Sequence, residues 1–318
     1  MADQVSYNFH LAKVISLLAV IVGHYAQVFH HPAASILWIP TQIGLFIFAF
    51  SSGYFTGKKY QGDYSLRDFW QAKISRLLGP LLVIDAFLVC LLIVKGHENV
   101  FHWHSLLACF GLSGVLMWLG EIPHTPMGAG LWFLTLLWLF YITFPALERL
   151  NRIKIRGAAA LIAGLVACLI LVHRVPFGVA FWETAWFFML GSYCGRNLKR
   201  VPLVVSAPVA LLCGCGIPIS KFVLQVPWAL TPLMIGLGLG VVGMLPTIRL
   251  PRSGSPIVVS ISAAMLEIYV IHTYLFVGGE SSLAVSLGLS LIMILVMASI
   301  LSPAGMALGR SLGLRLRC

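Results

Sequence analysis

The amino-acid sequence predicts an all-α, polytopic membrane protein with about ten transmembrane helices and both termini in the cytoplasm. The composition favours this fold class, because 59% of the 318 residues are hydrophobic and only 10% are charged. The mean hydropathy is +0.95. Soluble domains carry more charge and lack repeated apolar runs of about 20 residues. A third observation, the placement of the cations along the chain, gives the orientation of the predicted helices.

Apolar windows long enough to cross a bilayer recur along the whole chain. We expect ten spans, near residues 9–30, 36–56, 77–95, 129–148, 157–173, 184–197, 202–218, 227–246, 256–277 and 283–307. The stretch from Phe101 to Leu119 is also apolar, but Gly111, Ser113 and Gly114 interrupt it and histidines flank it. We interpret this stretch as an interfacial or re-entrant segment, not as an eleventh span.

The cations gather in alternate loops, as the positive-inside rule requires of a polytopic protein. Clusters around Lys58, Arg152, Lys199 and Arg252 follow the second, fourth, sixth and eighth spans. Together with Lys13 and the C-terminal arginines, they place all but three of the 21 Lys and Arg residues on one face. The formal net charge of +11 is therefore a topology signal, and we expect no nucleic-acid partner. The three exceptions are Lys95, Arg174 and Lys221.

No polar stretch is long enough for a separate soluble domain, so we expect residues 1–318 to form a single membrane-embedded domain. The seven cysteines are scattered and contain no C-x-x-C pair, which favours neither a disulfide framework nor a metal site. Most of them are expected to be small hydrophobic residues of the membrane interior. The glycines of "IGLGLGVVG", Ile235 to Gly243, favour close helix packing over a phosphate-binding loop.

The apolar stretch "KVISLLAVIVGH" begins with a cation, Lys13, and ends with an imidazole, His24. Eleven residues make about three helical turns, so both side chains lie on nearly the same helix face, about 16 Å apart along the axis. Lys13 can extend to the cytoplasmic headgroups and His24 can bond a neighbouring helix, which are structural roles. A histidine inside a span is costly and often functional, so a catalytic role for His24 is the alternative.

A second group of cations lies in "FWQAKISRLLGP", where Lys73 and Arg76 are three residues apart and Pro80 follows. Basic residues ahead of a span are ordinary topology signals. Together with Lys13 they are also suited to surround a polyanionic ligand at the cytoplasmic side of the membrane.

The sequence resembles the integral-membrane acyltransferase family 3, and the resemblance extends over essentially the whole chain. Each matching motif is short, but all occur in the family's order. The motifs are Lys13 with His24, "FAFSSGYF" with Ser52, Gly53 and Tyr54, Lys73 with Arg76 and Pro80, "LWFLTLLWLFYITFP" from Trp132 to Pro145, and "IYVIH" from Ile268 to His272.

The chain departs from the family pattern at two places. Family members often carry Arg at the position of Lys13, and Lys lacks the bidentate phosphate contacts of Arg. Many also carry an acidic residue where this chain has Leu137 and Trp138. The remaining intramembrane carboxylates are Asp85 and Glu267, each suited either to a structural pairing or to orienting a histidine.

The resemblance implies a membrane-bound O-acyltransferase that moves an acyl group, expected to be acetyl, from cytosolic acyl-CoA to a hydroxyl of an extracytoplasmic glycan. Its acceptor would be a surface polysaccharide, a lipopolysaccharide or a precursor, and its location the bacterial cytoplasmic membrane. His24 would be the general base, and Lys13, Lys73 and Arg76 would bind the phosphates of the donor. Acetyl-CoA would be a co-substrate, with no permanently bound cofactor and no metal. The candidate acceptor-site or supporting residues are Ser52, Tyr54, Asp85, Trp132, Glu267 and His272.

Two alternatives remain open from the sequence. One is a transporter or flippase of glycans or small anions that uses the same polar residues as a pathway. The absence of a visible internal repeat and the spacing of Lys13 and His24 favour the enzyme. The other is a family relative that has lost catalysis and assists assembly. The missing acid near Leu137 is the reason for this alternative. Consumption of acetyl-CoA by the purified protein separates the enzyme from the transporter.

The cation pattern predicts that both termini and the loops near Lys58, Arg152, Lys199 and Arg252 face the cytoplasm. Single cysteines placed in these loops should resist a membrane-impermeant thiol reagent added from outside. Cysteines near Lys95 and Lys221 should react under the same conditions. Strong outside labelling in two or more of the four loops would contradict the ten-span topology.

Overall fold

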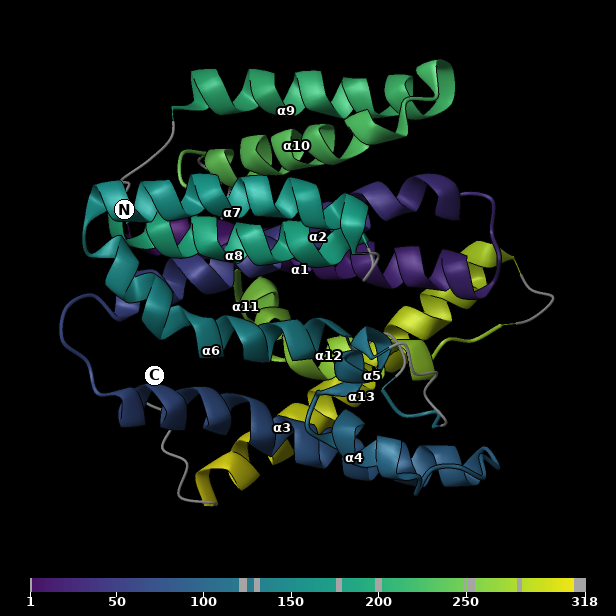
Figure 1. Ribbon diagram of the computed structural model, residues 1–318. Coiled ribbons are helices and arrows are strands. Elements are labelled where there is room, and N and C mark those ends of the chain that lie inside the picture. The colour runs from purple at the N-terminus through teal and green to yellow at the C-terminus, as the bar shows by residue number, and fades with distance from the viewer. Residues whose placement is uncertain are drawn as a thin grey trace. The chain divides into compact units, whose positions relative to one another are not determined.

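The computed structural model describes most of the chain as helices (Figure 1). Within the described residues there is no strand, so the all-α prediction is confirmed. The described ranges are 2–119, 125–128, 132–175, 179–197, 202–248, 250, 255–278 and 282–311. Several cations of the topology argument lie outside these residues, namely Lys199, Arg200, Arg249, Arg252, Arg315 and Arg317.

Eight helices of the described chain are long and apolar enough to cross a membrane. A bent pair counts as a ninth candidate when its two parts are taken as one span. It consists of α11 (Ser255–Ala263) and α12 (Met265–Ile271) with its 3-10 extension η3 (His272–Tyr274), and its bend is 59°. The eight are α1 (Ala2–Val28), α2 (Ala34–Lys59), α3 (Leu66–Val94), α6 (Trp132–Asn151), α7 (Lys154–Arg174), α9 (Leu203–Pro218) with η1 (Ile219–Leu224), η2 (Pro227–Ala229) with α10 (Leu230–Met244), and α13 (Leu283–Ser311).

The expected count of ten differs from these nine by one helix. The predicted span at residues 184–197 coincides with α8 (Val179–Asn197), which is a helix of 19 residues. Its sequence includes Glu183 and Arg196, so it is less apolar than the other candidates. The protein is thus an all-α integral membrane protein whose described residues contain eight to nine candidate spans and one further long helix, the more polar α8.

The segment from Phe101 to Leu119 forms two short helices, α4 (Trp103–Cys109) and α5 (Ser113–Trp118). With seven and six residues they are too short to span a bilayer. Gly111 joins them with a φ of 69°, a left-handed conformation that favours glycine. The segment is held by Thr135 of α6, whose hydroxyl accepts from the Gly114 amide and donates to the Gly111 carbonyl.

The chain divides into two compact units, each built from three stretches that alternate along the sequence. We call them the first and second unit. The prediction of a single domain stays a prediction. The first unit contains Met1–Gly23, Ala33–Gln61 and Ile142–Ser262, and the second contains His24–Pro32, Gly62–Tyr141 and Ala263–Cys318.

In the first unit, α2 and α8 pack backbone against backbone (Figure 1). A Cβ added at Gly53 would overlap the carbonyl oxygen of Phe188, and one added at Gly191 would overlap that of Phe50. The contact is therefore reciprocal, with glycine on both helices. Small residues let membrane helices approach closely enough for extensive van der Waals contact.

Polar side chains tie helix ends together in the first unit. The carboxylate of Glu148 accepts from Arg196 at 2.9 Å and from Arg152 at 3.1 Å. The amide of Asn8, at the start of α1, donates to the carbonyls of Leu245 and Ile248 just after α10. Such bonds satisfy carbonyls that the end of a helix leaves unpaired. Both contacts join ends that the cation pattern assigns to the same side of the membrane.

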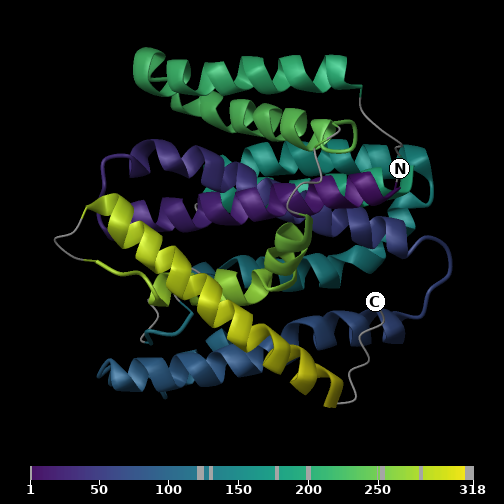
Figure 2. The same cartoon turned by 180° about the vertical axis from the view of Figure 1, so that it is seen from behind.

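In the second unit, α3 and α13 cross at small residues (Figure 2). A Cβ at Gly79 would come within 2.8 Å of the Gly309 Cα, and one at Gly305 within 2.8 Å of the Pro80 Cα. Helix α3 begins at a favourable N-cap, because the Ser65 hydroxyl accepts from the amide of Asp68. Pro80, which the sequence places just after the basic cluster, thus lies at a helix crossing.

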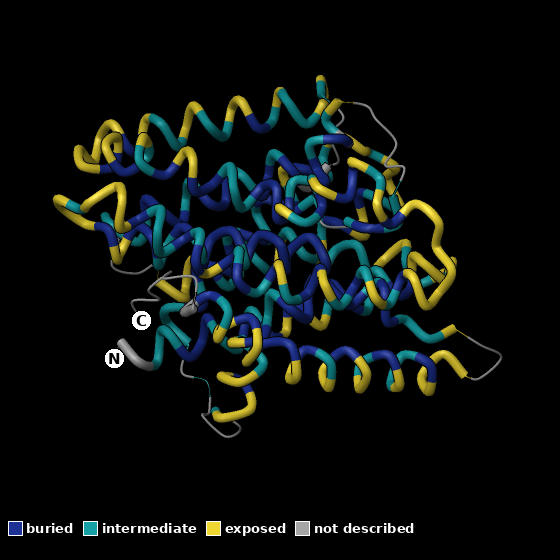
Figure 3. The backbone as a smooth tube through the Cα atoms, turned by 90° about the horizontal axis from the view of Figure 1, so that it is seen from below, coloured by how far each residue is buried: buried dark blue, intermediate teal, exposed yellow. Residues whose placement is uncertain are grey.

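Exposed residues recur along several helices (Figure 3), and many of them are large and aliphatic. In α9, Val204, Leu211 and Leu212 are 69–80% exposed. Ile155, Ile162 and Ile170 of α7 are also exposed. Aliphatic side chains in such numbers on the surface of long apolar helices are what lipid contact requires.

The α2–α8 contact predicts that Gly53→Ala destabilises the protein. Alanine ordinarily stabilises a helix relative to glycine, but here its methyl group must push the α8 backbone away, at a cost of about 1–3 kcal/mol. Thermal unfolding of the purified protein should show a lower midpoint. Gly288→Ala is the matched control, because a Cβ there meets no atom within 4 Å. Equal stability of the two variants would contradict the close contact.

Candidate functional site

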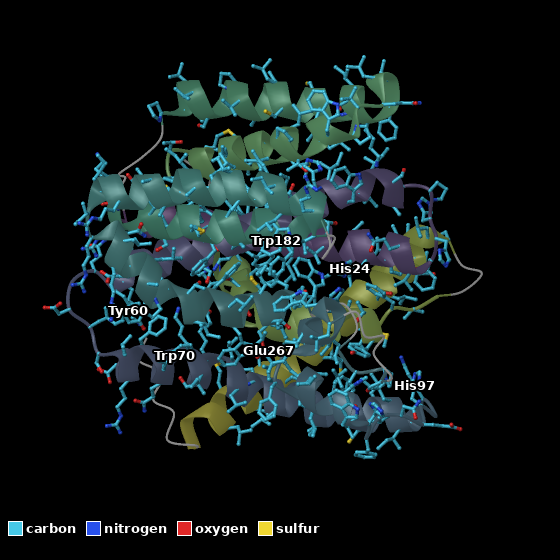
Figure 4. The ribbon with its side chains drawn as sticks, in the orientation of Figure 1. His24, Tyr60, Trp70, His97, Trp182 and Glu267 are labelled. Atoms are coloured by element: carbon cyan, nitrogen blue, oxygen red, sulfur yellow. The ribbon has the colours of Figure 1, made fainter. Side chains whose placement is uncertain are left out.

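The second unit brings two histidines together that are 248 residues apart in the sequence. His24 lies just before the last turn of α1 (Figure 4), and His272 begins the 3-10 turn η3. The Nδ1 atom of His24 is 2.8 Å from the Nε2 atom of His272. Their ring planes are nearly parallel, inclined by 13°, with centroids 5.1 Å apart. Two predicted site residues therefore form one hydrogen-bonded imidazole pair.

The end of α1 is held in place by the residue after His24. The hydroxyl of Tyr25 donates to the carbonyl of Val277 at 3.0 Å, and its ring packs edge-on against Phe276. The amide of Val277 in turn donates to the hydroxyl of Ser290 in α13 at 2.9 Å. Because Tyr25 is fixed in this way, the backbone that carries His24 is fixed as well.

His272 is fully buried and is held from its own helix. Its Nδ1 atom lies 2.5 Å from the carbonyl oxygen of Tyr269, one turn earlier. Two bonds anchor the end of this turn at Tyr274. Lys95 donates to the Tyr274 carbonyl, and the Tyr274 hydroxyl accepts from the amide of Gly128, both at 2.7 Å.

Helix α6, through the motif that starts at Trp132, contacts both the surroundings of His272 and one of the predicted donor-binding cations. Phe133 packs edge-on against Tyr269, with ring centroids 5.9 Å apart. Two turns later, the Tyr141 ring lies 4.3 Å from the ammonium nitrogen of Lys73. The sequence prediction missed Phe133, Tyr141 and Tyr269 as site neighbours. The signal was present, since all three lie within the quoted family motifs.

The two cations of α3 have different surroundings. Lys73 is buried, with its ammonium also 5.5 Å from the ring of Phe69, whereas Arg76 is exposed. Lys13 belongs to the first unit and is half-buried, with its ammonium 6.0 Å from the Phe55 ring. It is thus next to the Ser-Gly-aromatic motif of α2. Lys13 and His24 share α1, about 16 Å apart along its axis, as the sequence predicts.

Three other predicted residues have local packing contacts. Tyr54 stacks on Phe9 of α1 at 5.3 Å between ring centroids. Ser52 is half-buried, next to the tightly packed Gly53. Trp132 is half-buried at the start of α6, with its ring edge-on to Phe133. Tyr54 and Trp132 therefore contribute to packing, and the acceptor role of these residues stays a prediction.

The two predicted carboxylates differ in their hydrogen bonds. Glu267, labelled in Figure 4, is buried and accepts a hydrogen bond from Ser302 of α13. That bond ties α12 to α13. Asp85 of α3 is also buried, but its Oδ2 atom has no partner among the described residues. Neither carboxylate forms a hydrogen bond or ion pair with His24 or His272 in the described part of the chain.

A third buried carboxylate, Glu183 of α8, was not among the predicted site residues. It is fully buried in the first unit and accepts hydrogen bonds from Gln42 of α2 and Thr231 of α10. Its sequence signal is only that of a lone acid in an apolar segment. The bonds connect three helices, which gives Glu183 a structural role.

The described residues were also compared with the requirements of a metal site and of a reactive thiol. No group of three or more His, Cys, Asp or Glu side chains there is placed to hold a metal ion. Cys109 lies in the short helix α4, where burial and the neighbouring Asp85 carboxylate raise the pKa of its thiol to about 11. At neutral pH it therefore remains a thiol, which is a poor nucleophile.

Comparison with known protein families matches residues 6–307 to the acyltransferase family 3 model, described as an acyltransferase domain. The match covers nearly the whole chain and includes every residue of the site described above. No curated protein and no solved structure matches the chain.

Proposed function

Because this chain belongs to the integral-membrane acyltransferase family 3, we propose that it transfers an acyl group, most simply acetyl, from acyl-CoA to a hydroxyl of an extracytoplasmic glycan. One observation carries this proposal. The second unit contains both a paired histidine near one end of a span and the cations Lys73 and Arg76 near the start of another. A base and a polyanion site are what transfer from a coenzyme A thioester needs.

In the proposed reaction His24 acts as the general base. It takes the proton of the acceptor hydroxyl as the hydroxyl oxygen attacks the thioester carbon. The new carbon–oxygen bond gives the ester, and the carbon–sulfur bond breaks. The proton held by His24 then passes to the departing thiolate, which leaves as the free thiol of coenzyme A. His24 is restored, so the step needs no metal and no second co-substrate.

The donor phosphates are proposed to bind the cytoplasmic cations. Arg76 is exposed and offers the planar fork of donors that suits phosphate oxygens. The ammonium of Lys73 lies near the rings of Phe69 and Tyr141, which favour a cation at this position. We assign Lys13 the same role, on the family motif that it shares with His24. The long uncharged arm of coenzyme A would carry the thioester from the cations towards the histidine.

The acceptor is proposed to be a surface polysaccharide, a lipopolysaccharide or one of their precursors. The position of His24 supports this acceptor, because His24 lies three turns from Lys13 on α1, on the side that the cation pattern places outside. A glycan hydroxyl would reach it from that side. The same orientation supports a location in the bacterial cytoplasmic membrane, where the donor is available on the inner face.

The first test uses the purified full-length protein in lipid vesicles. Release of free coenzyme A thiol from acetyl-CoA, with an acyl group recovered on added glycan, is the expected result. A transporter would move the glycan or anion across the vesicle membrane without releasing thiol. Comparing surface glycans of cells with and without the protein would then identify the acceptor and the acylated hydroxyl.

Arg76→Ala should raise the KM for acetyl-CoA while leaving the KM for the acceptor nearly unchanged. A lost charge-assisted hydrogen bond is worth about 1.5–3 kcal/mol, which corresponds to roughly a 10- to 150-fold change. Arg67→Ala is the matched control, because Arg67 is exposed on the same helix but nine residues away, on the opposite face. Unchanged donor kinetics in a folded Arg76→Ala protein would remove Arg76 from the site.

His24→Gln should leave folding and acetyl-CoA binding intact and reduce acyl transfer by roughly two to four orders of magnitude, the usual contribution of a positioned base. Glutamine keeps a hydrogen-bonding side chain but takes no proton at neutral pH. His97→Gln, at the exposed position labelled in Figure 4, is the control and should retain full activity. Near wild-type transfer by His24→Gln would show that His24 has a structural role only.

A further inference from the structure

We propose that His272 is a positioning residue that fixes the tautomer of His24, so that the base of the reaction is the Nε2 atom of His24. This inference rests on the proposed function for its catalytic meaning. Its structural part, the direction of one hydrogen bond, stands on the geometry of the second unit alone.

The direction of the hydrogen bond between the two histidines follows from the second bond of His272, which is made to the carbonyl group of Tyr269. The oxygen of Tyr269 can only accept, so the Nδ1 atom of His272 must carry a proton and donate to it. A neutral imidazole has one protonated nitrogen, which leaves the Nε2 atom of His272 as an acceptor. The Nδ1 atom of His24, 2.8 Å away, must then be the donor. The remaining lone pair on His24 is therefore on Nε2.

The alternative is a doubly protonated His272 that donates to His24. This form would place a cation on a side chain with 0% exposure. The rings around it are those of Tyr269 and Phe276. No carboxylate pairs with it in the described chain, and an unpaired charge in such surroundings is costly. The neutral pair, with His24 as donor, is the arrangement that the burial favours.

The direction of this bond has a consequence for catalysis. When His24 takes the hydroxyl proton on Nε2, it becomes an imidazolium whose Nδ1–H already donates to a neutral acceptor. The lone pair on the Nε2 atom of His272 is thus already in place to stabilise the new charge, without reorganisation. The same bond fixes the ring, so the lone pair of Nε2 points away from His272. His272 therefore acts through His24 and need not touch the substrate.

The tautomer can be measured without any assay of activity. The full-length protein, labelled with ¹⁵N at histidine Nδ1 alone, is reconstituted in lipid and studied by solid-state NMR at neutral pH. The resonance lost in His24→Gln, or in His24→Asn if the first variant folds poorly, belongs to His24. We expect this nitrogen to be protonated in the wild type. An unprotonated Nδ1 on His24 would overturn the proposal, whether or not the protein transfers acyl groups.

Substitutions at His272 test the positioning role. The oxygen of Gln reaches the place of Nε2 and can accept from His24, whereas the shorter Asn cannot reach it and Leu has no acceptor. Transfer should fall roughly 10- to 100-fold in His272→Leu, a typical cost of losing a residue that orients a functional imidazole. His272→Asn should resemble His272→Leu, and His272→Gln should lie closer to the wild type.

A matched control removes another buried imidazole of the second unit. His104, in α4, is 2% exposed, and His104→Leu should keep wild-type activity. If His272→Gln is as inactive as His272→Leu while both proteins fold, His272 does more than accept a hydrogen bond and the proposal fails. If His272→Leu is fully active, the pair has no positioning role. If the wild type transfers no acyl group, the proposed function fails, and the NMR result still decides the tautomer.

Discussion

The close approach of α2 and α8 at their glycines is the contact on which the first unit depends. Between helices in lipid there is no hydrophobic driving force, so association rests on packing and on polar contacts. Gly53 and Gly191 remove the side chains that would keep the two backbones apart. The Ser-Gly-aromatic motif of the family thus has a packing function in this chain, and α3 with α13 repeats the device at Gly79 and Gly305.

Once the helices are fixed, polar groups inside them can be satisfied only by neighbours. The second unit uses backbone carbonyls for this purpose: Tyr25 donates to Val277, Lys95 to Tyr274, and His272 to Tyr269. A carbonyl is a neutral acceptor that is always present, which avoids a further buried charge. The same bonds that satisfy these side chains hold the end of α1 and the turn after α12 in a fixed arrangement.

The sequence predicts the elements of this structure better than their pairing. Eight of the ten expected spans correspond to helices of the described chain that are long and apolar enough to cross a membrane, or nine if the bent pair is counted as one span, because length and hydropathy are local properties. The motif order points to His24 and His272, but not to a bond between residues 248 positions apart, because only tertiary packing decides that contact. The sequence also could not predict that Lys73 is buried while Arg76 is exposed, since helical spacing does not say which face of a helix a neighbour covers. Glu183 was missed because it belongs to no motif.

A second imidazole is a suitable partner for a base inside a membrane. A carboxylate would hold the ring of His24 as firmly, but before the reaction it would be a buried charge without a cation to balance it. The carboxylates of the second unit are placed elsewhere: Glu267 binds Ser302, and Asp85 lies near Cys109. A neutral acceptor costs less to bury, and in the proposed mechanism it still stabilises the charge that His24 acquires. The pair therefore keeps the resting site uncharged, which is what the low dielectric of the bilayer favours.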